Sequence, residues 1–197
     1  MADSLYLNLW FSSFDEAEML PRLLCVLKQF PFSSSKPGIA HISIHGVSWS
    51  EPEIFEESFD YRATPEQAAA LASEFLHDDN GYIFEAAWDL WSPAETGEDW
   101  VKRPHPVKFL MHGARFEESA WEENGNIQLD LGLDSEFLLE GAELDALAEM
   151  RIKENIETLV NFTTALEKKC GIRARLLWSE SEENLAQKLI ARLQRVN

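Results

Sequence analysis

Apolar residues occupy every second position along Ser4–Phe11, where Leu5, Leu7 and Leu9 alternate with Tyr6 and other polar or aromatic residues. A period of two is typical of a β-strand that buries one face. The same kind of pattern predicts six further strands, at Ile39–Trp49, Glu53–Arg62, Tyr82–Trp91, Val107–Phe116, Ile127–Leu133 and Ile172–Trp178. We therefore expect about seven strands.

Apolar residues spaced by threes and fours predict four helices. The first follows Ser13, where Pro21 either kinks the helix or marks its true start. The second begins at Thr64, because a capping threonine is followed by proline at the first helical position. The third is long, from about residue 142 to residue 170, and the fourth lies near the end of the sequence.

The order of these elements predicts an α+β protein. Residues 1–91 read βαββαβ, which is the ferredoxin-like order, and residues 107–197 read ββαβα. Between them, residues 92–106 contain three prolines and a glycine and are the best candidate for a linker. Asn124-Gly125 predicts a hairpin turn inside the second part. The two parts form either separate domains or one continuous domain.

Charge narrows the range of partners. The formal net charge is −18, and Phe116–Met150 contains eleven acidic residues with no Lys or Arg. Phosphate groups are bound through Lys and Arg, so this distribution argues against nucleic acids and anionic membranes. One interpretation is that the charge only keeps the protein soluble, and the other is that it complements a basic protein partner.

Short segments of the sequence predict the cellular location of the protein and the state of its two cysteines. The sequence begins without the basic and apolar regions of a signal peptide, and no apolar run approaches the roughly 20 residues of a membrane span. These features predict a cytoplasmic protein. Cys25 and Cys170 lie among apolar residues, which favours two buried free thiols over a disulfide.

Motifs for common chemistries are missing. The sequence has no phosphate-binding glycine loop, no metal-binding pattern of the CxxC or HExxH type and no GxSxG elbow. His41 and His45 are four residues apart on a strand, hence about 13 Å apart, which is too far for one shared metal ion. His112 lacks an evident nucleophile nearby and is interpreted as structural. We therefore predict no catalytic residue, metal or cofactor, although an enzyme built from dispersed residues stays open.

Strand alternation predicts one distinctive surface. If the leucines of the first strand face the helices, the other face of the sheet carries aromatic, imidazole and carboxylate side chains together. The candidate interaction surface consists of Tyr6, Trp10, His41, His45, Glu85, Asp89 and Trp91. The competing interpretation is that the second part of the chain covers this face.

These observations favour a non-enzymatic binding or regulatory protein that acts through protein–protein contacts, such as an inhibitor or immunity-type protein that neutralises a basic enzyme. The alternative is an enzyme or small-molecule-binding protein with a pocket between the two parts, lined by Trp88, Trp91, Trp100, His105 and His112. A homodimer that buries the Trp-rich face is a third interpretation.

Overall fold

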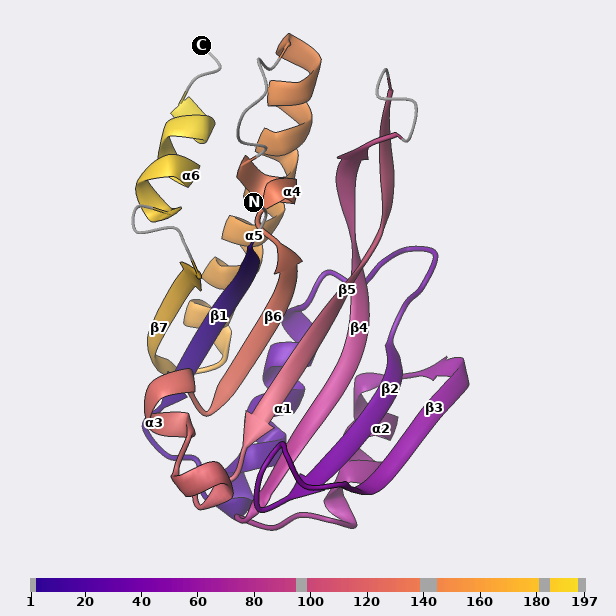
Figure 1. Cartoon of the computed structure of the whole chain (residues 1–197), viewed down its shortest axis with the longest axis vertical. Coiled ribbons are helices and arrows are strands. Elements are labelled where there is room, and N and C mark those ends of the chain that lie inside the picture. The colour runs from indigo at the N-terminus through magenta and orange to yellow at the C-terminus, as the bar shows by residue number, and fades with distance from the viewer. Residues whose placement is uncertain (1–2, 95–98, 139–144, 181–184, 195–197) are drawn as a thin grey trace.

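The computed structural model describes residues 3–94, 99–138, 145–180 and 185–194, and it is built around one seven-stranded sheet (Figure 1). The strands are β1 (Ser4–Phe11), β2 (Ile39–Gly46), β3 (Glu53–Ala63), β4 (Asn80–Pro93), β5 (Trp100–His112), β6 (Ile127–Leu133) and β7 (Ile172–Ser179). They lie in the order β3-β2-β4-β5-β6-β1-β7, and every neighbouring pair is antiparallel. The predicted number of strands is confirmed.

The larger helices pack on one face of this sheet. The helices are α1 (Glu16–Gln29), α2 (Pro65–Ser73), α3 (Trp121–Asn124), α4 (Ser135–Leu138), α5 (Ala146–Lys169) and α6 (Leu185–Gln194). Figure 1 shows α1, α2 and α5 behind the strands. The inward positions of the strands, such as Leu7, Ile42 and Phe109, are fully buried beneath them. This two-layer arrangement confirms the α+β class and leaves the front of the sheet without these helices.

The ferredoxin-like description of the first part is not confirmed. In sequence the elements β1, α1, β2, β3, α2 and β4 do follow the predicted order. In space, however, β1 pairs with β6 and β7, and β5 and β6 separate it from β4. Strands from the two parts of the sequence are therefore mixed within one sheet, in which β1 lies between β6 and β7.

Most of the predicted linker at residues 92–106 consists of strand. The strands β4 and β5 extend as a long hairpin whose pairing reaches Pro93 and Trp100, and residues 95–98 lie outside the described part. Along this extension β5 has β4 as its partner, since β6 pairs only with residues 108–111. A strand with one free edge tolerates proline, which explains Pro104 and Pro106.

The helix starts were predicted with mixed success. The capping box at Thr64 is confirmed, because its hydroxyl accepts a hydrogen bond from the Gln67 amide. The first helix is instead capped by Asp15 rather than Ser13, and Pro21 lies inside it. Two single-turn helices, α3 and α4, raise the predicted number from four to six among the described residues. Asn124-Gly125 ends α3 and is not a two-residue hairpin turn.

The prediction of free thiols is wrong. Cys25 on α1 and Cys170 at the end of α5 form a disulfide, with 5.6 Å between their Cα atoms. This pairing could not be predicted from local sequence pattern, because the two cysteines are 145 residues apart and meet only when α1 packs beside α5. Disulfides persist mainly in oxidising compartments. The predicted cytoplasmic location is not confirmed.

Within the described ranges, no helix is both long enough and apolar enough to cross a membrane.

Candidate functional site

Three of the candidate surface residues lie in one row across the front of the sheet. Strand register places His41 opposite Glu85, Glu85 opposite Lys108, Lys108 opposite Asp130, and Asp130 opposite Tyr6. Ser58 and Trp178 complete this first row on the two edge strands. A second row, one step along the strands, consists of Glu56, Ser43, Ile83, Leu110, Gln128, Asn8 and Leu176. We call these two rows the open sheet face.

Neighbouring side chains of the first row contact one another. The Tyr6 and Trp178 rings are stacked with 4.7 Å between centroids. Lys108 Nζ lies 3.2 Å from Glu85 Oε1, and His41 Nδ1 lies 2.9 Å from the Ser58 hydroxyl. This row therefore combines an aromatic pair at one edge with ion pairs and hydrogen bonds toward the other.

Exposure varies along the second row, in which Asn8 and Ser43 are buried. Leu176 is 50% exposed, and Ile83 and Leu110 are only partly buried in the middle of the sheet. Gln128 donates a hydrogen bond to Asn8 across 3.0 Å. The open sheet face thus carries apolar groups at its centre and along its β7 edge, which resembles an interface more than an ordinary solvated sheet.

His45 and Trp10 lie at an end of the sheet that is covered. Trp49 packs edge-on against His45, His112 and Phe116. Trp10 donates its indole N–H to the Trp121 carbonyl on α3, 3.0 Å away. The interpretation that later residues cover the sheet therefore holds for this end, and the open sheet face lies beyond it.

Replacing Gly81 by alanine should destabilise the fold at this covered end. Gly81 lies between His45 and His112, and a Cβ here would be 2.6 Å from Phe116 Cε1 and 2.8 Å from Trp49 Cη2. Both rings must shift, so we expect a loss of about 1–3 kcal/mol in the free energy of unfolding, measured by urea denaturation.

Gly46→Ala is the matched control for Gly81→Ala. Gly46 is on the adjacent strand, and a Cβ there would approach no atom closer than 3.6 Å. Its denaturation midpoint should stay near that of the unmodified protein. Equal midpoints for the two variants would contradict the packing of Trp49 and Phe116 over β4.

Asp89 and Trp91 belong to other local structures. Asp89 accepts hydrogen bonds from the Ser34 amide and hydroxyl at 2.9 and 2.8 Å. Burial raises the pKa of Asp89, but hydrogen bonds from Ser33 and Ser34 outweigh burial and leave that pKa below its ordinary value. The Trp91 indole donates to Glu154 of α5, and Arg151 lies 3.7 Å from the ring centroid. The seven predicted surface residues thus lie in four separate surroundings.

The acidic segment Phe116–Met150 is also divided by the fold. Glu117 to Glu123 lie in the connection that precedes β6, whereas Asp134 and Asp145 follow that strand. The seven residues of β6 span about 20 Å. The run of acids in the sequence is therefore not one continuous patch.

The buried histidine His112 is structural. It is 1% exposed, and its Nδ1 donates a hydrogen bond to the Gly125 carbonyl at 2.9 Å. Burial lowers its pKa to about 4, against which the Gly125 contact acts only weakly. A histidine that is covered by Trp49 and neutral at pH 7 has no access to a substrate proton.

One arrangement of serine, histidine and carboxylate was not predicted. The Ser92 hydroxyl donates to Glu136 at 2.7 Å and contacts His105 Nε2 at 2.8 Å. Since the serine proton goes to Glu136, the imidazole must donate to the serine oxygen. A catalytic triad needs histidine in the middle as the acceptor of the serine proton. This order does not activate Ser92 as a nucleophile.

Metal-binding potential is limited among the described residues. His41 and His45 interact with separate partners, Glu56 and Glu53, as expected from their spacing. Glu16, His77 and Asp78 place one ligand atom each within 4.8 Å of one another. Asp78, however, already pairs with the Arg115 guanidinium at 2.7 Å. A cation there would have to displace or share that ion pair.

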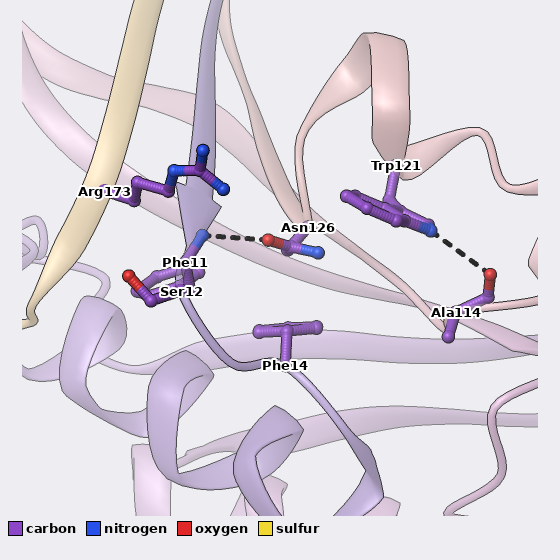
Figure 2. A pocket seen from close by; sticks show the side chains of 7 residues that line it. All are labelled: Phe11, Ser12, Phe14, Ala114, Trp121, Asn126 and Arg173. Atoms are coloured by element: carbon purple, nitrogen blue, oxygen red, sulfur yellow. Dashed lines mark hydrogen bonds between the residues drawn. The ribbon is translucent and has the colours of Figure 1, made fainter.

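The residues predicted to line a pocket between the two parts do not all lie together. Trp88 is fully buried against Phe30 and Phe137, and His112 lies in the separate cluster under Trp49. A pocket of about 190 Å³ lies at the end of β1 (Figure 2). It is lined by Phe11, Ser12, Phe14, Ala114, Trp121, Asn126 and Arg173. These residues come from both parts of the chain, but none was predicted for a site.

No protein family model, curated protein or solved structure matches this chain.

Proposed function

We propose that this is a non-enzymatic binding protein that acts through protein–protein contacts, with the open sheet face as its contact surface and a basic protein as its partner. An inhibitor or immunity-type protein that neutralises a basic enzyme is the most specific form of this proposal. The observation that carries it is a seven-stranded sheet with α1, α2 and α5 on one face only (Figure 1).

The composition of the open sheet face supports a protein partner. A sheet face that is exposed to solvent normally carries polar residues. Here it carries the stacked Tyr6–Trp178 pair and Leu176, which is half exposed. Aromatic rings provide much of the binding energy when a partner excludes water from them. A protein that covers this face would bury these rings together with Ile83 and Leu110.

Charge supports a basic partner. The edge strand β3 places two exposed carboxylates along one side of this face, on Glu53 opposite His45 and on Glu56 opposite Ser43. Attraction between opposite charges raises association rates by about 10- to 1000-fold. The net charge of −18 also makes a second copy of the chain an unfavourable partner, because the copies repel each other.

Charge reversal on β3 should slow binding of this partner. The immobilised protein would first be exposed to lysate of its own organism at low and moderate salt, and the retained basic protein identified. We expect Glu53→Lys with Glu56→Lys to lower its association rate about tenfold at low salt, because both carboxylates lie at the rim of the open sheet face. Stopped-flow kinetics with the purified pair would measure this.

A matched control has the same net charge but changes the opposite side of the molecule. Glu74→Lys with Glu157→Lys alters two exposed acids at the end of α2 and on α5. This variant should keep most of the original rate. Equal rates for the two double variants, or no protein retained at either salt, would refute the proposal.

A further inference from the structure

We propose that the pocket at the end of β1 binds a small organic anion, namely a carboxylate attached to a flat apolar group. The pocket lies where β1 leads into α1, where β5 connects to β6, and where β7 begins (Figure 2). Its volume of about 190 Å³ is below the roughly 300 Å³ at which pockets for drug-sized ligands begin. It therefore suits a ligand of about the size of one substituted ring.

Aromatic rings supply the walls. Phe11 and Phe14 are stacked with 5.5 Å between centroids, and Trp121 lies across the pocket from them. The Trp121 ring is held in place because its indole N–H donates to the Ala114 carbonyl at 3.2 Å. Rings fixed in this way favour a flat apolar group, which they can contact at little cost in side-chain entropy.

Asn126 supplies a buried donor. Its side chain is only 5% exposed, and its Oδ1 accepts a hydrogen bond from the Phe11 amide at 2.9 Å. That bond fixes the orientation of the side chain, so that its Nδ2 is turned into the pocket (Figure 2). Among the described residues Nδ2 has no hydrogen-bond partner. Nδ2 is not sealed from solvent, so an acceptor atom of a ligand in the pocket can replace the solvent at this donor.

Arg173 supplies the positive charge, and an irregularity of β7 aims it. Trp10 pairs with Ala174 and Phe11 with Ile172, so Arg173 is an extra residue in β7 with no partner on β1. Such bulges redirect a side chain and are frequent next to binding sites. Figure 2 shows the guanidinium extending toward Asn126. Arg173 makes no ion pair within the described part of the chain, whereas Arg175 pairs with Glu167 at 2.6 Å.

The two polar groups define the ligand chemistry. A guanidinium and an amide N–H₂ are both donors, so they select a group that only accepts hydrogen bonds, and a carboxylate fits both. The net charge of −18 repels anions from the molecule as a whole. Selection of a carboxylate over other ligands must therefore come from these local contacts and not from long-range attraction.

Benzoate is a suitable probe for this site. We expect it to bind with a dissociation constant of about 1 mM, a value typical of a weak ligand of this size. Titration followed by NMR should shift the side-chain amide of Asn126 and the indole of Trp121. Benzyl alcohol has the ring without the charge, and acetate has the charge without the ring. Each should bind at least about tenfold more weakly than benzoate.

Two variants and one control test the residues. Arg173→Gln removes the charge from an exposed side chain, and Asn126→Asp keeps the acceptor for Phe11 while it replaces the donor by a carboxylate. Each should weaken benzoate binding about tenfold. Arg175→Gln makes the same charge change on the same strand and should leave binding within about twofold. Equal affinity for benzyl alcohol, equal loss in the two arginine variants, or no shift below about 10 mM benzoate would overturn the proposal.

Discussion

Reduction of the Cys25–Cys170 disulfide should lower the free energy of unfolding by about 2–5 kcal/mol. The bond joins residues that are 145 positions apart, and a loop of that length restricts the unfolded chain strongly. In the loop-entropy description the effect for about 100 residues is already about 4.7 kcal/mol, and measured values are often smaller. The comparison is between urea denaturation curves with and without a reductant.

The chain offers a clean form of this experiment, because it contains no cysteine besides these two. A reductant can therefore act on no other disulfide within the chain. Cys25→Ser with Cys170→Ser should reproduce the reduced midpoint and lose all response to reductant. A thiol reagent that labels two cysteines in the native, unreduced protein would show that the bond is absent.

The second large effect is a dependence of stability on pH that originates at His112. Burial lowers the pKa of this imidazole to about 4 in the folded state, while the unfolded value is about 6.5. The unfolded chain therefore binds the proton more readily between these values. The contribution of His112 to the free energy of unfolding is fully present above about pH 6.5. It falls as the pH is lowered toward 4, by about 3 kcal/mol in total.

His112→Asn isolates this contribution from that of the many carboxylates. The asparagine amide can replace Nδ1 as the donor to the Gly125 carbonyl, but it does not titrate. The difference in unfolding free energy between the original protein and the variant should shrink as the pH falls from 7.5 to 4.5. A difference that stays constant over this interval would mean that His112 is not buried in its neutral form.

Local sequence pattern predicted the strands well because their burial is local. Ser4–Phe11 and Ile127–Leu133 were predicted with the bounds that the structure has, since each alternates cleanly between one buried and one outward face. The pattern contains no information about which strands become neighbours. For that reason the pattern could not predict the pairing of β1 with β6 and β7. It also could not predict the contact between Cys25 and Cys170.

The candidate surface was predicted in part for the same reason. Alternation correctly placed Tyr6, His41 and Glu85 on one face, and the register brings them into one row. It could not show that Trp49 and α3 cover the end with His45 and Trp10. The pocket was missed because Arg173 faces it through a bulge, which breaks the alternation on which the prediction depended.

The position of β1 has a consequence for how the chain folds. This strand is made before the other six strands of the sheet, yet both its neighbours, β6 and β7, come more than a hundred residues later. During synthesis at about 5–20 residues per second, its hydrogen-bonding edges stay unpaired for roughly six seconds or more before β6 is made. A topology with such distant contacts has a high contact order and folds slowly. Nascent chains would thus expose an unpaired leucine-rich strand, the kind of segment that chaperones protect from aggregation.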